Sequence, residues 1–365
     1  MKLIIAGGGT GGHLFPGIAV TEEFLSRDPG NEVLFVGTER GIEARAVPAA
    51  GYHLELISAA GIRGKRTLSQ LKGVAMMIYG YAQSRKILKS FRPDMVLGVG
   101  GYASLPMVLA ARGMRIPRFI HEQNAIPGQT NRLLAKFASK VFITLEESAC
   151  YFPAATTLLT GNPLRRQILD MIENVSTTCA EDDVRFADNF RLFIFGGSQG
   201  AHAINAAMIE ALPLLKKGRG KFIITHQTGE KECAEVTAAY RAAGVEAKVT
   251  SFISDMAAEY ARADLIICRA GATTIAEVTA CGKACLFIPF PHAVDDHQRR
   301  NAEALLKKDA CFMMLERELT GETLAQSILT LAEDPNLVRS TGELAFSLAR
   351  LDAARIIVDE MMNTH

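Results

Sequence analysis

The stretch Lys2–Val20, KLIIAGGGTGGHLFPGIAV, predicts how the chain begins to fold. Four apolar residues lead into a loop in which five of six residues are glycine, and His13 follows this loop directly. Apolar residues then recur at helical spacing. A strand, a glycine-rich loop and a helix in this order form a site where backbone amides bind a phosphate or a sugar. The alternative is a tight turn followed by an incidental histidine.

The same rhythm continues along the chain, because short β-branched runs alternate with helical patterns such as Ile18–Ser26 and Leu68–Ser90. Alternation of this kind predicts parallel sheets covered by helices on both faces. The expected strands are Lys2–Ala6, Glu32–Val36, His53–Ile57, Met95–Val99, Arg118–His121, Val141–Thr144, Arg191–Phe195, Phe222–Thr225, Lys248–Phe252, Leu265–Cys268, Cys285–Pro289 and Phe312–Leu315.

A Gly-Asn-Pro turn within Leu158–Arg166 and an acidic insert at Glu181–Asp183 interrupt this alternation. On each side the first strand opens into glycine, as GGGTGGH and as GGSQGAH. We therefore expect two Rossmann-like, doubly wound α/β domains that face a central cleft. The expected boundaries are 1–160 and 161–345, with a C-terminal helix of about 345–365 packing back onto the first domain. Ligands of such sheets bind outside the carboxyl ends of the strands.

The bulk composition excludes several classes of protein. The chain has 365 residues, of which 48% are hydrophobic and 22% charged, as in ordinary globular proteins. Seven cysteines without a Cys-x-x-Cys pair argue against a disulfide framework and against structural zinc. A net charge of +1 argues against nucleic acid as a partner. With no apolar run long enough to span a membrane, we expect a cytoplasmic protein.

The glycine motif alone does not define a nucleotide enzyme. It matches Gly-x-Gly-x-x-Gly, but the second strand ends Val36-Gly37-Thr38, without the acidic residue that holds a dinucleotide's ribose. A nicotinamide dehydrogenase is therefore disfavoured.

The run CRAGATTIAE, which ends at Glu277, is more informative about a nucleotide site. Its amides and hydroxyls would hold a diphosphate while Glu277 accepts the ribose hydroxyls. The alternative is that Glu277 binds no ligand and stands there because the helix dipole favours a carboxylate near the N-terminus of a helix. His121-Glu122 could be metal ligands, but further ligands at suitable spacing are missing nearby, so no metal is expected.

Seven strings resemble the MurG family of peptidoglycan glycosyltransferases and cover nearly the whole chain. They are GGTGGHLFPG, GVGGYAS, HEQNAIPG, LTGNPLR, GGSQGA, CRAGATTIAE and PFPHAVDDHQ. The resemblance implies the GT-B fold and transfer of N-acetylglucosamine, with inversion and without a cofactor. The donor would be UDP-N-acetylglucosamine, and the acceptor the 4-hydroxyl of undecaprenyl-pyrophosphoryl-N-acetylmuramoyl-pentapeptide. The product would serve cell-wall synthesis and thereby cell shape and division.

The resemblance also implies roles for individual residues. His13, Tyr102 and Glu122 match positions for acceptor binding or catalysis; His13 is our first choice as general base and Glu122 our second. His292 stands where the family commonly has aromatic or other polar residues. Ile253 would bind uracil through its backbone, Ser198 the diphosphate and Gln298 the sugar hydroxyls. The complete implied donor site is Thr10, Gly11, Gly12, Asn124, Arg165, Ser198, Ile253, Ala272, Thr273, Thr274, Ile275, Ala276, Glu277 and Gln298.

Two rival functions stay open at this point. A UDP-N-acetylglucosamine 2-epimerase would share the fold but would need no lipid acceptor. A non-catalytic scaffold would leave the many polar residues of the expected cleft without a role.

One segment predicts contact with a membrane surface. Between Leu56 and Pro93 there is no Asp or Glu, but there are eight lysines and arginines. The helix expected there has an apolar surface wider than one packing stripe, flanked by basic residues, as in helices that dock on anionic phospholipid. We expect peripheral attachment to the cytoplasmic face of the inner membrane; a solvated face of a packed helix is the alternative. The proposed patch is Lys72, Met76, Met77, Tyr79, Arg85, Lys86 and Lys89.

Overall fold

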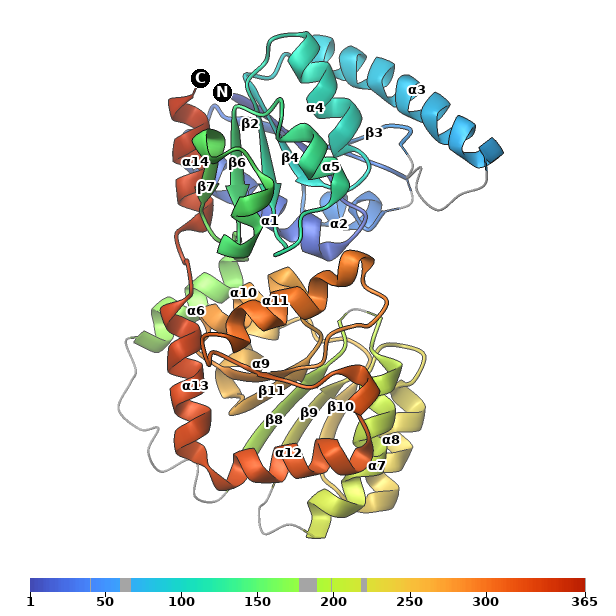
Figure 1. The fold of residues 1–365 in the computed structure, drawn as a ribbon, viewed down its shortest axis with the longest axis vertical. Helices are drawn as coiled ribbons and strands as arrows, with labels where there is room; N and C mark the ends of the chain where they lie inside the picture. The colour runs from blue at the N-terminus through green and yellow to red at the C-terminus, as the bar shows by residue number, and fades with distance from the viewer. Residues whose placement is uncertain (40, 60–66, 177–188, 198, 218–221, 365) are drawn as a thin grey trace. The chain divides into compact units, whose positions relative to one another are not determined.

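The computed structural model describes residues 1–39, 41–59, 67–176, 189–197, 199–217 and 222–364, with only the backbone described at 67–72, 74, 175 and 176. Internal contacts divide the chain into two units (Figure 1). The first unit comprises Met1–Arg166 and Arg350–His365, and the second comprises Gln167–Ala349. The C-terminal residues thus return to the unit in which the chain began.

The first unit contains a sheet of seven parallel strands in the order β3-β2-β1-β4-β5-β6-β7. The six expected strands are all present, and β7 was not expected because three half-buried residues carry almost no periodic signal. The strands are β1 Lys2–Gly7, β2 Glu32–Gly37, β3 Leu54–Leu56, β4 Met95–Gly100, β5 Arg118–Glu122, β6 Lys140–Ile143 and β7 Thr157–Leu159.

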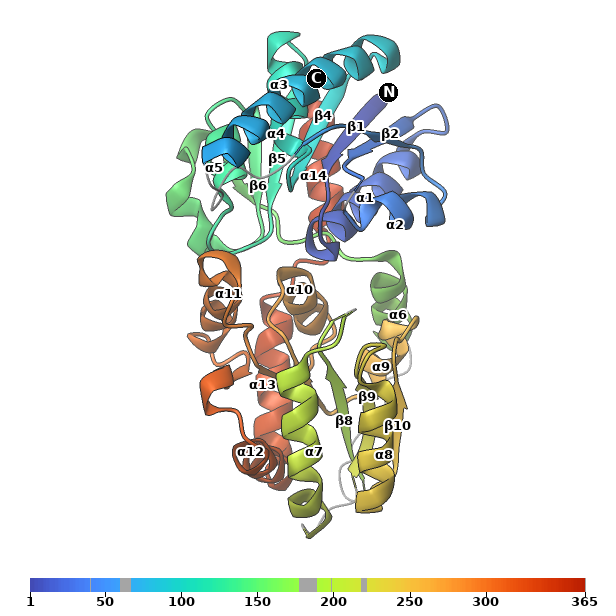
Figure 2. The same cartoon turned by 90° about the vertical axis from the view of Figure 1, so that its right-hand side faces the viewer.

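Alternate residues of these strands point to opposite faces of the sheet and build two apolar layers. One layer packs Ile4 and Val96 against α3, α4 and α5. The other packs Leu3 and Met95 against α1, α2 and α14. Helices α1 and α14 lie side by side although they come from opposite ends of the chain (Figure 2). The helices are α1 Gly11–Arg27, α2 Glu43–Ala49, α3 Thr67–Phe91, α4 Ser104–Gly113, α5 Gln129–Leu134 and α14 Ala353–Asn363.

The second unit repeats this plan with six parallel strands in the order β10-β9-β8-β11-β12-β13. The strands are β8 Phe190–Phe195, β9 Phe222–Gln227, β10 Ala247–Thr250, β11 Leu265–Cys268, β12 Ala284–Phe287 and β13 Phe312–Met313. The α-helices described between residues 166 and 347 are α6 Arg166–Ser176, α7 His202–Lys217, α8 Cys233–Ala243, α9 Met256–Arg262, α10 Ala272–Ala280, α11 His297–Leu306, α12 Gly321–Glu333 and α13 Pro335–Ser347.

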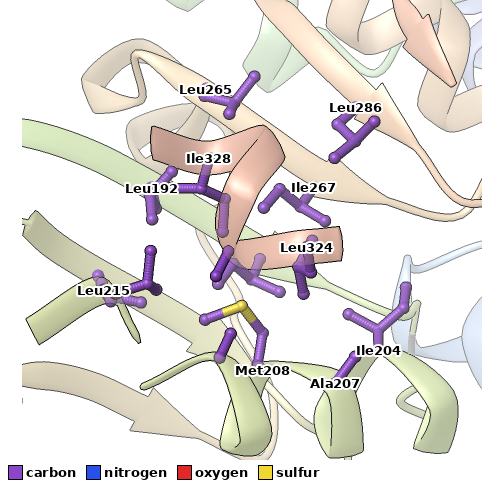
Figure 3. Close-up of a cluster of buried hydrophobic side chains, with 14 of the residues drawn as sticks. Leu192, Ile204, Ala207, Met208, Leu215, Leu265, Ile267, Leu286, Leu324 and Ile328 are labelled. Carbon is purple, nitrogen blue, oxygen red and sulfur yellow. The ribbon is translucent and has the colours of Figure 1, made fainter. Parts of the chain in front are cut away.

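One apolar cluster of the second unit shows why its sequence forms these layers. Met208 of α7 and Ile328 of α12 are fully buried against Leu192 and Ile267 of the sheet (Figure 3). Each of these side chains contributes about 1.5–3 kcal/mol by leaving water. The cluster therefore fixes α7, and with it the loop between β8 and α7.

Both sheets reverse their strand order beside their first strand, between β1 and β4 and between β8 and β11. In doubly wound sheets the ligand site lies at this reversal, outside the carboxyl ends of the strands. Each unit thus offers one candidate position, formed in both by a glycine-rich loop. Among the described helices, none is both long and apolar enough to cross a membrane.

Candidate active site

The first glycine loop joins β1 to α1 and touches the loop that follows β4. The backbone at Gly7, Gly8 and Gly9 has φ values of 151°, 136° and 89°, which favour glycine. The Gly8 N–H donates to the carbonyl oxygen of Gly100 at 3.3 Å. A side chain at Gly101 would lie 2.4 Å from the Gly8 carbonyl oxygen. Glycine is therefore required where the two loops meet.

Glu43, at the start of α2, holds this loop from the side of β2. Its Oε2 accepts the Gly9 N–H at 2.7 Å, and its Oε1 accepts the N–H and hydroxyl of Thr38 at 2.9 and 3.0 Å. The residue is only 1% exposed. A Cβ atom at Gly8, Gly37 or Gly41 would collide with its carboxylate or stem. Our sequence analysis missed Glu43, because two of its three donors are backbone N–H groups, which leave no sequence signal. The glycines around it were the available hint.

His13 lies in the first turn of α1, half-buried. Its Nδ1 lies 3.2 Å from the Thr10 hydroxyl. A side chain at Gly100 would lie 2.6 Å from the His13 ring, so the imidazole packs directly on the loop after β4. Gly11 and Gly12 belong to the same helical turn. The structure thus brings four of the predicted residues together at the carboxyl edge of β1.

Tyr102 and Glu122 differ sharply in their surroundings. Tyr102 follows β4 and is 57% exposed. Glu122 ends β5, is buried, and accepts four hydrogen bonds. The donors are the Asn124 N–H at 3.0 Å, the Asn124 amide at 3.3 Å, the Gly128 N–H at 3.2 Å and the Asn131 amide at 2.8 Å.

The bonds to Glu122 have a chemical consequence. Burial raises the pKa of Glu122, and its four donors oppose that shift. A carboxylate whose oxygens already accept these donors is poorly disposed to take a substrate proton. Its hydrogen bonds link it to Asn124 and to the first turn of α5. Asn131 was also missed in our sequence analysis.

His121 has a hydrogen-bond partner within the first unit on each of its ring nitrogens. Its Nδ1 accepts from the Gln123 amide at 3.0 Å, which leaves Nε2–H to donate to the Gly161 carbonyl oxygen at 3.2 Å. The pKa of His121 is lowered to about 4, mainly by burial and also by nearby His13, against the opposing effect of the Gly161 bond. The ring is therefore neutral, and its hydrogen bond to Gly161 links β5 to the segment after β7.

Arg165 lies at the end of the first unit, and its guanidinium carbon is 5.4 Å from the centre of the Phe15 ring. Phe15 belongs to α1, two residues after His13. This contact places a positive charge on the helix that carries the first glycine loop.

In the second unit a carboxamide organises the glycine loop after β8. The Gln227 amide donates to the Gly197 carbonyl oxygen, and its Oε1 accepts the Ile253 N–H, both at 2.9 Å. A side chain at Gly200 would overlap the Thr228 carbonyl. Ser198, expected at the diphosphate, lies outside the described residues. A uracil that used the Ile253 N–H would have to displace Gln227, another residue that our sequence analysis missed.

Helix α10 begins at the reversal point of the second sheet, after Gly271 in an extended conformation. Its first turn holds Ala272, Thr273 and Thr274, and Thr273 and Thr274 are partly exposed. One turn further, beyond buried Ile275 and half-buried Ala276, stands Glu277. These six residues form one continuous turn-and-a-half of helix.

Glu277 is buried and is held by a second buried side chain. The Tyr260 hydroxyl donates to Glu277 Oε2 at 3.0 Å. The Tyr260 ring is fully buried and lies edge-on to Phe193 and Phe195 of β8. An aromatic cluster thus fixes one oxygen of the carboxylate. Tyr260 was missed because its residue type and spacing indicate only core packing.

Arg269 supports the loop after β12. Its guanidinium donates to the carbonyl oxygens of Ile288 and Pro289 at 3.0 and 3.3 Å, and pairs with Glu316 at 2.5 Å. The next residue of the loop, Phe290, has its ring 5.4 Å from the guanidinium carbon.

Gln298 closes the same loop, because its Oε1 accepts the Phe290 N–H at 3.0 Å. Asp295 and Asp296 are both left-handed, with φ of 54°, a conformation that costs aspartate energy and often marks functional segments. His292, the departure from the family pattern, is exposed and lies edge-on to Phe290.

Comparison with known proteins agrees with this architecture. Residues 3–143 match the glycosyltransferase family 28 N-terminal domain, and residues 191–352 match the corresponding C-terminal domain. A Pelobacter propionicus protein is 69% identical over 99% of both chains, and a Geobacter sulfurreducens protein is 66% identical over 99% of this chain and 98% of its own. Both are named UDP-N-acetylglucosamine–N-acetylmuramyl-(pentapeptide) pyrophosphoryl-undecaprenol N-acetylglucosamine transferase.

Solved structures give the same result. The crystal structure of Acinetobacter baumannii MurG is 32% identical, covers 99% of both chains and superposes with a TM-score of 0.80. A Neisseria meningitidis UDP-GlcNAc 2-epimerase, solved with UDP-GlcNAc, covers both chains completely at a TM-score of 0.67 but is only 14% identical, so it shares the fold alone. The two parallel-sheet units are those of the GT-B fold, and the chain belongs to the MurG family of glycosyltransferases.

Proposed function

We propose that this protein transfers N-acetylglucosamine from UDP-N-acetylglucosamine to the 4-hydroxyl of undecaprenyl-pyrophosphoryl-N-acetylmuramoyl-pentapeptide. The observation that carries the proposal is 69% identity, over 99% of both chains, to a relative named for this transfer. An epimerase is the weaker candidate, because the epimerase structure shares only 14% of its residues with this chain.

The donor nucleotide binds the second unit in this proposal. Glu277, oriented by Tyr260, accepts the ribose hydroxyls, and the first turn of α10 receives the diphosphate at its amides. The described residues of the loop Gly196–Ala201 include no backbone amide that donates to a carboxylate. Gln298, on the loop that Arg269 supports, binds the hydroxyls of the N-acetylglucosamine.

The acceptor binds the first unit, and His13 removes the proton from its 4-hydroxyl. The oxygen attacks the anomeric carbon as the bond to UDP breaks, so the configuration inverts in a single displacement. Amides at the start of α10 stabilise the charge that develops on departing UDP. His13 is preferred over Glu122 as the base because Glu122 already accepts four hydrogen bonds.

A single assay tests this function. Purified protein is incubated with UDP-N-acetylglucosamine, with or without a muramoyl-pentapeptide lipid, and released UDP is measured together with the sugar product. We expect UDP only when the lipid is present, with a disaccharide formed in equal amount. Epimerised UDP-sugar formed without the lipid would overturn the proposal in favour of the epimerase.

We further propose that the protein attaches peripherally to an anionic phospholipid surface at the cytoplasmic face of the inner membrane. Support comes from α3, whose inner face buries Gly80, Ser84 and Leu88. Its outer face exposes Ile78 by 67% and Tyr79 by 60%. Exposed apolar groups of that size do not serve the core of this unit.

The same outer face continues into exposed Arg85, Lys86 and Lys89. Met76 and Met77 are half-buried beside the apolar part, and the Lys72 side chain lies outside the described atoms. Apolar residues followed by cations on one face suit an interfacial helix, where each cation adds about 1 kcal/mol.

Vesicle cosedimentation tests the attachment. Arg85, Lys86 and Lys89 are changed together to Glu, and a control variant carries the same change at exposed Arg241, Lys307 and Lys308 of the second unit. We expect salt-sensitive binding to anionic vesicles that the first variant loses and the control keeps. Vesicle binding that changes neither with salt concentration nor with either set of substitutions would contradict the proposal.

A further inference from the structure

The carboxylate of Glu43 lies where the first unit would otherwise bind an anion. It accepts the backbone N–H of Gly9, in the loop after β1, and that of Thr38, in the loop after β2. In dinucleotide-binding sheets of this topology, the amides of the loop after the first strand hold a phosphate. Here one of those amides is already bonded to a side chain of the protein.

The surroundings of Glu43 are shaped to this group. Three glycines, Gly8, Gly37 and Gly41, come so close that a Cβ atom on any of them would lie within 2.4 Å of a Glu43 atom. A buried carboxylate costs free energy unless it is hydrogen-bonded, and the three donors from Gly9 and Thr38 meet that need. The arrangement is a closed anion site whose anion is part of the chain.

The site connects to His13 through two residues. Gly9, held by Glu43, precedes Thr10, and the Thr10 carbonyl oxygen accepts the His13 N–H at 3.2 Å. The Thr10 hydroxyl lies at the same distance from His13 Nδ1. A shift of Gly9 would therefore move both the backbone and the side-chain contact that orient the imidazole.

We propose that Glu43 is a positioning residue of the transferase: its carboxylate replaces a phosphate on the first glycine loop and sets the Thr10–His13 turn for proton abstraction. The inference rests on the proposed function, since it gives His13 its task.

Removal of the carboxylate and its replacement by a small anion test the inference. Glu43→Ala opens a space lined by the Gly9 and Thr38 amides, and formate has the shape and charge of the missing group. We expect turnover of Glu43→Ala to fall about 100-fold, the size of loss that a misplaced catalytic group produces. Added formate should restore turnover with saturation, and should raise the melting temperature of this variant by binding its folded state.

Two further variants make the test specific. Glu43→Gln fills the space but sets an NH₂ donor against an amide donor, so turnover should fall without any response to formate. Asp94→Ala is the matched control, because Asp94 Oδ2 accepts the Lys2 N–H at 2.6 Å at the opposite end of β1. This control loses a comparable carboxylate–amide bond, yet its turnover should stay within a few-fold of wild type and ignore formate.

The outcomes separate cleanly. Turnover of Glu43→Ala close to wild type would overturn the inference, and so would formate that raises the melting temperature without restoring turnover. If Glu43→Ala does not fold, Glu43→Gln decides: unimpaired turnover overturns the inference, and reduced turnover with unchanged UDP affinity supports it. Failure of the proposed function has a different mark, since the wild-type protein would then release no UDP in the presence of the lipid.

Discussion

The two glycine loops occupy equivalent places in sheets of equivalent strand order, yet their chemistry is opposite. In the first, the Glu43 carboxylate accepts a loop N–H; in the second, the Gln227 carboxamide donates to a loop carbonyl oxygen. The first loop thus carries a buried negative charge, whereas the second is held by a neutral group. Because the strand order is the same, topology alone does not distinguish the two loops. In the proposed function, the side chain that meets each loop decides which half binds the nucleotide.

The largest effect is expected at the first loop. His13→Ala should lower transfer by about 10²–10⁴-fold, the usual contribution of a general base, while UDP affinity changes little. Steady-state kinetics with a muramoyl lipid, together with calorimetry of UDP binding, measure both quantities. Turnover within a few-fold of wild type would remove His13 from the mechanism and leave the first loop a purely structural feature.

The second loop is probed through the helix start beside it. Glu277→Ala removes a charge-assisted acceptor for two ribose hydroxyls, each bond worth about 1.5–3 kcal/mol at most, so UDP affinity should fall at least about tenfold. Circular dichroism and the melting temperature report whether the variant is folded. Wild-type UDP affinity in a folded variant would move the ribose away from α10.

A smaller effect is expected from the residue behind Glu277. Tyr260→Phe removes the hydroxyl that donates to Glu277, and UDP affinity should fall by up to about tenfold. Affinity for 2′-deoxy-UDP should fall less, because one of the affected ribose bonds is absent from that ligand.

The matched control is Tyr240→Phe, whose buried hydroxyl instead contacts His226 at 3.2 Å. Both variants lose one buried hydroxyl in the same unit. Equal losses of UDP affinity in the two would mean that Tyr260 acts through general packing.

A last effect concerns acid stability, to which one buried histidine in each unit contributes. Burial lowers the pKa of His121 to about 4 in the first unit and that of His226 to about 3 in the second. The pKa of histidine in the unfolded chain is near 6.5. Below that pH these histidines therefore bind protons in the unfolded chain but stay neutral in the folded chain. Stability is therefore complete above about pH 6.5 and falls with acid by about 1.4 kcal/mol per pH unit for each histidine.

Urea unfolding at about pH 7 and about pH 5 measures this loss. His121→Gln should reduce it by about 2 kcal/mol, the share of one histidine over that interval. An unchanged pH dependence would show that His121 becomes protonated while the first unit remains folded.

The sequence predicts most of the fold for a clear reason. Parallel strands buried on both faces read as unbroken apolar runs, and all twelve expected strands occur. Their edges shift because hydrogen bonding, rather than apolarity, sets the ends: the strand expected at Phe312–Leu315 spans only Phe312–Met313. Strand β7 was not predicted, because its three residues are half-buried and show no alternation of apolar and polar positions.

The candidate site is less accessible from sequence. Motif residues such as His13 and Glu277 stand out because glycines and hydroxyls surround them. Glu43, Gln227 and Tyr260 do not, because each acts on a backbone group or on another side chain across the fold. Their positions carry the pattern of an ordinary helix, strand or core residue. Only the folded arrangement reveals such contacts.

The most direct test of the comparison is UDP calorimetry on two variants side by side. Glu43→Gln changes the charge at the first loop without opening a space, and Glu277→Ala changes the second unit. We predict that Glu43→Gln binds UDP within about twofold of wild type, while Glu277→Ala weakens binding by at least about tenfold, or 1.4 kcal/mol. The contrary result, UDP binding lost in Glu43→Gln and kept in Glu277→Ala, would place the nucleotide on the first loop and contradict the account.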